Sequence, residues 1–124
     1  MTIGERAVGA VTVLDLEGKL TLGDGAPEFR QAVDALLAAG RVKVVFGLRS
    51  LGLLDSSGLG EIVRAHTSMV SRGGGVRMLQ PTERTAMLLK ITKLSSVLPS
   101  FDSEEAAVAS FGHVRLRAVR IRAA

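Results

Sequence analysis

Short apolar runs alternate with segments of helical periodicity along this chain, and that alternation limits what it can fold into. Two such runs on either side of Gly9 predict a β-hairpin. Strands that then alternate with helices predict an α/β layer with some parallel pairing. The predicted strands are residues 5–8, 11–17, 42–48, 76–79 and 97–101, and the predicted helices are residues 26–39, 56–72 and 82–91, with a last helix that begins after Ser103.

The composition describes one domain. A chain of 124 residues with 47% apolar and 23% charged residues is long enough for a core and ordinary for a soluble globular protein. The absence of Cys excludes disulfides, thiol nucleophiles and thiolate metal sites, and it is compatible with a reducing cytoplasm. The N-terminus does not resemble a signal peptide, and no apolar run is long enough to span a bilayer. We therefore expect a cytoplasmic protein without membrane insertion.

The net charge of +4 is unevenly distributed. Up to Gly112 the basic and acidic residues balance, and the excess comes from arginines at positions 115, 117, 120 and 122. A basic tail is not a basic domain, so direct DNA binding is not expected. We divide the chain into a domain, residues 1–112, and an Arg-rich C-terminal tail, residues 113–124. The tail pattern fits an edge strand, an exposed arm or a short helix, and the sequence does not choose among them.

The hexapeptide at residues 55–60, Asp-Ser-Ser-Gly-Leu-Gly, puts two adjacent serines where a strand ends and a helix begins. Asp55 is the predicted N-cap, because its carboxylate can accept a free amide of the first turn. Ser57 then lies beside the positive end of the helix. Gly58 and Gly60 weaken the helix, which indicates either close approach of another backbone or packing against the chain's own sheet.

Helical geometry, at 100° per residue, separates the two serines. Ser56 lies within about 20° of Val63 and is expected to turn inward. Ser57 lies within about 40° of Glu61 and Arg64, on the polar side that a partner or a kinase can reach. The stripe predicted to face the core consists of Leu59, Ile62, Val63, His66, Met69 and Val70.

No residue pattern in the sequence supports a catalytic function. A serine hydrolase needs a base within hydrogen-bond reach, but His66 lies about 13 Å along the helix from Ser57 and on another face. His66 is instead expected to pack in the core, and His113 has no neighbouring carboxylate or second ligand. The glycines at 73–75 lack the Lys-Ser/Thr ending of a phosphate-binding loop and predict a helix stop. We expect no enzyme activity, no cofactor and no metal site.

The hexapeptide and the residues before it carry a family resemblance. Val44-Val45, Leu48, Leu51 and the run from Leu54 to Gly60 resemble the signature of STAS-domain anti-sigma-factor antagonists, over roughly residues 5 to 112. The resemblance implies a STAS-like single domain of α/β class, with a mixed four- to five-stranded sheet flanked by about four helices. In that family the second serine of the motif is phosphorylated, which implies Ser57 here. Gly47 is a departure, because many members carry Asp or Asn there.

The resemblance also implies partners. The unphosphorylated protein would bind an anti-sigma factor that is also a serine kinase of the histidine-kinase-like ATPase type, and would release it when Ser57 is phosphorylated. A serine phosphatase would reset the switch, and ATP would belong to the kinase. The implied partner-binding residues are Thr21, Asp24, Asp55, Ser56, Gly58, Leu59, Gly60, Glu61 and Arg64.

Three alternative functions also fit the sequence. One is a stressosome-like scaffold subunit, in which the same serine tunes assembly of a large complex. Another is an accessory subunit of a lipid-transport ATPase, although the second serine is often replaced in such proteins. The third is an output piece of a guanylate- or phosphorelay-linked pathway.

Overall fold

The computed structural model describes residues 1–112 of the chain, so the tail arginines and His113 lie outside the described residues. Five strands form one mixed sheet in the order β1-β2-β3-β4-β5, in which β1 pairs antiparallel with β2 and the other neighbours pair in parallel. The α/β fold class predicted from the sequence is confirmed, and so is the mixed sheet of four to five strands that the family resemblance implied. The strands are β1 (Thr2–Val8), β2 (Val11–Leu20), β3 (Lys43–Leu54), β4 (Gly75–Leu79) and β5 (Ser100–Phe101), and the helices are α1 (Ala26–Ala38), α2 (Ser56–Ser71), α3 (Glu83–Ile91), the 3-10 turn η1 (Leu94–Ser96) and a helical segment at residues 104–112.

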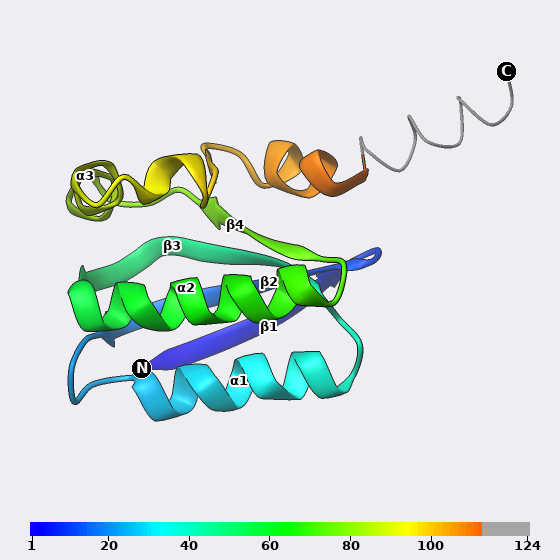
Figure 1. Cartoon of the computed structure of the whole chain (residues 1–124), viewed down its shortest axis with the longest axis horizontal. Coiled ribbons are helices and arrows are strands. Elements are labelled where there is room, and N and C mark those ends of the chain that lie inside the picture. The colour runs from blue at the N-terminus through cyan, green and yellow to red at the C-terminus, as the bar shows by residue number, and fades with distance from the viewer. Residues whose placement is uncertain (113–124) are drawn as a thin grey trace, which may run out of the picture.

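The two faces of the sheet are covered unequally. Figure 1 shows α1 and α2 side by side on one face, where they enclose the main core, with the rings of Phe29 and Phe46 5.1 Å apart. The segment at residues 104–112 covers part of the opposite face. Because both faces are covered there, β2 reads as a continuous buried run at its start. The smaller core on that opposite face consists of Val11, Val13, Val45, Leu79, Ala107 and Phe111.

Strand β3 is longer than predicted. The expected strand ended at residue 48, but β3 continues to Leu54 and pairs with β2 along its length, with Leu54 opposite Leu20. The prediction missed this half because Arg49, Ser50 and Gly52 interrupt the apolar run. Pairing with a neighbouring strand keeps the backbone extended in spite of them.

The fifth strand is shorter than predicted. Residues 97–101 were expected to be extended, but only Ser100–Phe101 pairs with β4. The preceding residues turn through η1, and Leu98 is buried against the main core. Side chains cap the starts of the two helices that follow β4 and β5, because Thr82 Oγ1 accepts the amide of Thr85 at 3.2 Å and Ser103 Oγ accepts the amide of Ala106 at 3.1 Å.

Parallel pairing determines where the site lies. Because β2, β3 and β4 run in the same direction, their carboxyl ends meet at one edge of the sheet. The loop at residues 21–25 follows β2 and the hexapeptide follows β3, so both lie at this edge. Within residues 1–112 no helix combines the length and the apolar character needed to cross a membrane.

Candidate functional site

Asp55 fastens the start of α2. Its backbone is extended, and Oδ1 accepts a hydrogen bond from the Gly58 amide at 2.8 Å, as predicted for an N-cap. Oδ2 accepts a second bond, from the amide of Leu22 at 3.1 Å. Two hydrogen bonds hold the pKa of the Asp55 carboxyl below its usual value. The bond from the Gly58 amide has the larger effect, and the bond from the Leu22 amide has the smaller one. One ionised side chain therefore joins the start of α2 to the loop after β2.

Both serines of the hexapeptide are exposed. The predicted exposure of Ser57 is confirmed, and its hydroxyl makes no hydrogen bond to any other described residue. The prediction that Ser56 turns inward is wrong. Periodicity does not show where the layer beneath a helix ends, and burial along α2 starts only at Gly58. Two adjacent hydroxyls are thus accessible at one helix N-terminus.

Gly58 and Gly60 have different surroundings. A Cβ added at Gly58 would overlap the carbonyl oxygen of Leu20, so this glycine lets α2 pack closely on the chain's own sheet. A Cβ added at Gly60 would meet nothing within 4 Å, which leaves an open surface there. Gly58 and Leu59 are buried, and they support the exposed surface from below instead of forming part of it.

The loop at residues 21–25 is held tightly. The amide of Thr21 donates to the carbonyl of Asp24 at 2.9 Å, and the amide of Asp24 donates back at 3.1 Å. Between them Leu22 is 82% exposed, although its amide is bound to Asp55. Thr21 and Asp24 were predicted as partner-binding residues of this loop, whereas Leu22 was not. The available signal was a lone large apolar residue in a turn beside Gly23.

Glu61 and Arg64 lie one and two turns further along α2. The Glu61 carboxylate accepts hydrogen bonds from Arg30 of α1 at 2.9 and 2.6 Å, and only 15% of its side chain is exposed. Arg64 lies 3.6 Å from the same carboxylate and is 58% exposed. The hydrogen bonds from Arg30 hold the pKa of Glu61 below its usual value. Glu61 therefore ties the two helices together, which its sequence position did not reveal.

The buried stripe of α2 is rotated from the predicted one. Ala65 is buried, whereas Val70 is 50% exposed and His66 is only half-buried. The core prediction for Val70 is therefore wrong, and that for His66 holds only in part. The reason is that α1 packs beside α2, so the small Ala65 side chain lies in the helix contact opposite Phe29. The remaining buried residues of α2 are Gly58, Leu59, Ile62 and Met69.

Gly47 lies where the family resemblance implies a polar side chain. A Cβ added here would overlap the Asp15 carboxylate of β2. Asp15 in turn pairs with Arg6 at 2.8 Å, and Arg6 pairs with Glu104 at 2.6 Å. A carboxylate from the neighbouring strand thus lies beside the position that a side chain at residue 47 would use.

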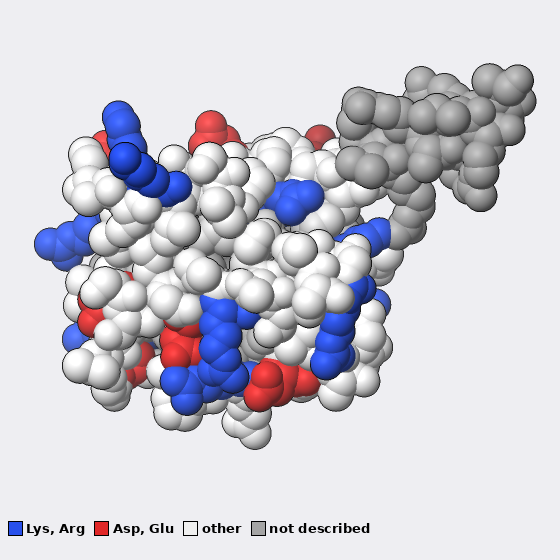
Figure 2. Space-filling view, in the orientation of Figure 1, with Lys and Arg blue, Asp and Glu red and all other residues white. Residues whose placement is uncertain are grey.

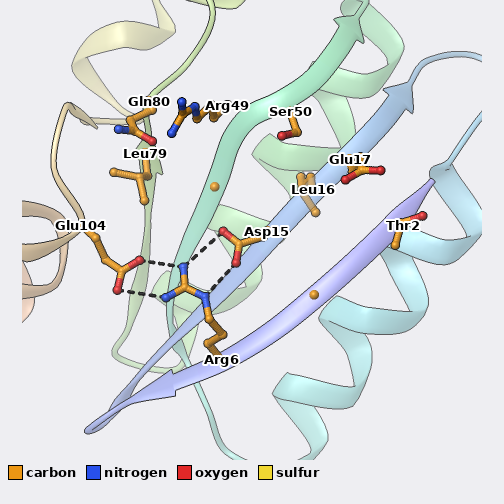
Figure 3. A pocket seen from close by; sticks show the side chains of 12 residues that line it. Thr2, Arg6, Asp15, Leu16, Glu17, Arg49, Ser50, Leu79, Gln80 and Glu104 are labelled. Carbon is orange, nitrogen blue, oxygen red and sulfur yellow. Dashed lines mark hydrogen bonds and ion pairs between the residues drawn. The ribbon is translucent and has the colours of Figure 1, made fainter.

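The face of the sheet opposite α1 and α2 carries a groove of about 450 Å³. Figure 3 shows Arg6 between Asp15 and Glu104 along one side, with Arg49 and Gln80 on the other. None of the residues predicted from the hexapeptide or from the loop after β2 lines this groove. Among residues 1–112 no group of three or more potential metal ligands occurs. The candidate site is therefore the surface around Ser57.

Comparison with known proteins decides the family. A profile of the STAS domain matches residues 5–107. The chain belongs to the STAS domain family. No curated protein matches this STAS domain in sequence.

Solved structures share the fold of this STAS domain. A Thermotoga maritima protein assigned as an anti-sigma factor antagonist has a TM-score of 0.82 and 24% identity, over 88% of this chain and 93% of its own. The Bacillus cell fate determinant SpoIIAA, solved in its phosphorylated form, has a TM-score of 0.69 and 18% identity, over 88% and 98%. A sulfate transporter family protein from Wolinella succinogenes has a TM-score of 0.71 and 17% identity, over 86% and 89%. At these identities the likeness establishes the fold and not the function.

Proposed function

We propose that this STAS domain is an anti-sigma factor antagonist, which binds an anti-sigma factor when Ser57 is unmodified and releases it when Ser57 is phosphorylated. The observation that carries the proposal is the exposed Ser57 hydroxyl, without a hydrogen bond to other described residues, at a helix start fastened by Asp55. Two structurally similar proteins support it: the Thermotoga maritima protein and SpoIIAA, which is an anti-sigma factor antagonist and has been solved in a phosphorylated form.

The modification is a phosphoryl transfer in which the partner supplies both the nucleotide and the catalytic groups. A bond forms between Ser57 Oγ and the γ-phosphorus of the partner's ATP, while the bond from that phosphorus to the β-phosphate oxygen breaks. The hydroxyl proton passes to a base of the kinase, and ADP leaves. A serine phosphatase later hydrolyses the phosphoester. The STAS domain itself performs no catalysis, and the exchange takes place in the cytoplasm.

Phosphorylation switches off binding through charge and not through unfolding. A phosphoryl group adds about −1.5 to −2 charge, which the free amides and the dipole of a helix N-terminus tolerate. The fold is therefore kept. A partner surface complementary to the neutral Ser57 hydroxyl must instead accommodate a dianion beside Asp55, and like charges brought together across an interface weaken binding strongly.

Capture from native lysate tests the proposal. The wild type is compared with Ser57→Ala and Ser57→Asp, and the matched controls are Ser56→Ala and Ser56→Asp on the adjacent exposed serine. A histidine-kinase-like ATPase should be retained by the wild type and by Ser57→Ala and lost with Ser57→Asp. Incubation of that kinase with ATP should then label the wild type and Ser56→Ala but not Ser57→Ala. Equal retention by Ser57→Asp and the wild type would contradict the proposal.

The same fold in a sulfate transporter family protein favours one second candidate, an accessory subunit of a transporter. That function predicts that the domain captures a transport ATPase, and that substitution of Ser57 does not change this capture. A scaffold subunit differs from both in the mass of its assembly. It would elute as a large complex in size-exclusion chromatography. The partner that is captured and its response to Ser57→Asp therefore separate these functions.

A further inference from the structure

A cluster of three charged side chains bridges α1 and α2 beyond Ser57. Arg30 Nε and Nη2 donate to the two carboxylate oxygens of Glu61 at 2.9 and 2.6 Å, and Arg64 Nη1 lies 3.6 Å from one of them. Figure 2 shows basic and acidic side chains side by side over the α1 and α2 face. We call Arg30 and Arg64 the arginine pair. Two cations thus share one carboxylate in the crevice between the helices.

Ser57 lies on the same stripe of α2 as this cluster. Residues 57, 61 and 64 are spaced by four and then three, which puts Glu61 and Arg64 each within about 40° of Ser57 around the helix. Side chains of a helix lean toward its N-terminus, so those of Glu61 and Arg64 lean toward Ser57. One helical turn, about 6 Å of rise, separates Ser57 from Glu61. A group added to Ser57 is therefore within reach of the arginine pair.

The arginine pair has N–H groups that can donate hydrogen bonds to an anion. Each guanidinium carries five N–H groups, and Arg30 uses two of them on Glu61. The side chains of Arg30 and Arg64 are 52% and 58% exposed, so neither is buried away from a new ligand. The charge of Asp34 also acts on Arg30, and Asp55 caps α2 two residues before Ser57.

We infer that Arg30 and Arg64 form an internal binding site for the phosphoryl group of phosphorylated Ser57. This inference deepens the proposed function and rests on it. The phosphoryl oxygens accept guanidinium N–H groups, for which a phosphate dianion competes better than the single charge of Glu61. The modified side chain is then held against its own domain. Such a contact stabilises the released state and keeps the anion at a fixed place.

Phosphorus NMR on the full chain, with phosphoserine installed genetically at position 57, tests this site. The second pKa of phosphoserine is measured in the wild type, Arg30→Gln, Arg64→Gln and the double variant. Two guanidinium contacts favour the dianion, so the double variant should raise this pKa by about one unit. Arg72→Gln is the matched control, because Arg72 also joins α2 to α1, through Leu37, but lies about 22 Å along the helix from Ser57. It should leave the pKa unchanged.

Other outcomes decide against the site. An equal pKa in the double variant and in Arg72→Gln overturns it, and so does an equal response when phosphoserine is placed at Ser56 instead. Arg30→Lys keeps the charge but loses the planar fork of the guanidinium. The second pKa of phosphoserine in this variant should therefore lie between the values for the wild type and for Arg30→Gln. Because the phosphoserine is installed without a kinase, failure here leaves the proposed function standing. Failure of the lysate capture, in contrast, contradicts that function whatever the NMR shows.

Discussion

Asp55 accepts a hydrogen bond from the backbone amide of Leu22 at 3.1 Å, across 33 residues of sequence. With its other carboxylate oxygen Asp55 caps α2 through the amide of Gly58. A single side chain therefore determines both where the helix begins and where the loop after β2 lies. The relative position of Ser57 and the exposed Leu22 side chain depends on this pair of bonds.

Removal of the Asp55 carboxylate should destabilise the domain. Asp55→Ala loses a helix cap and the loop contact together, and we expect the melting temperature to fall by roughly 5 °C. Because the folded-state pKa of Asp55 is lowered, the advantage of the wild type is full above the usual carboxyl pKa of 3.8 and is lost as the pH falls through the folded value. Thermal unfolding followed by circular dichroism at several pH values measures both effects. Asp24→Ala, which removes an equal charge from the loop, should change little.

Leu22 should matter for binding and not for folding. Because its side chain is 82% exposed, Leu22→Ser should leave the free energy of unfolding within about 0.5 kcal/mol of the wild type. If Leu22 is an apolar anchor beside Ser57, the affinity for the captured anti-sigma factor should fall about tenfold. Calorimetric titration measures this, with Val70→Ser in the last turn of α2 as the control. Unchanged affinity in Leu22→Ser would exclude the loop from the interface.

The two glycines of the hexapeptide should respond oppositely to alanine. Gly58→Ala puts a methyl group onto the carbonyl of Leu20 and should cost about 2 kcal/mol or more of stability. Gly60→Ala adds a methyl group in open space and should stabilise by up to about 1 kcal/mol, because alanine favours the helix. Urea denaturation of both variants gives the comparison. Similar values for the two would mean that Gly58 does not pack closely on β2.

His66 should make stability depend on pH. Burial, and then the charge of Arg77, holds the pKa of His66 below its usual value of 6.5. The folded state therefore binds fewer protons than the unfolded state, and stability should decrease as the pH falls from about 6.5 through the folded pKa. His66→Gln should flatten this dependence in urea denaturation between pH 7.5 and 5. His113→Gln, which removes the other imidazole, should retain it.

Part of the site could be predicted from the sequence because it depends on local interactions. The Asp55 cap and the exposure of Ser57 depend on neighbours within one helical turn, and they were predicted correctly. Ser56 was misplaced because the periodicity of α2 does not show where the layer beneath the helix ends. Leu22 was missed because nothing near it in sequence indicates that its amide is held by Asp55.

By itself, then, the sequence determined the order of the elements, the α/β class and the helix start that exposes Ser57, because periodicity and capping act over a few residues. Only the tertiary structure decided that Arg30 meets Glu61, that Gly58 touches Leu20 and that Leu22 lies beside the hexapeptide. These contacts join residues more than thirty positions apart. They exist because parallel pairing of β2 and β3 brings the loop after β2 to the start of α2, and packing then sets α1 beside α2.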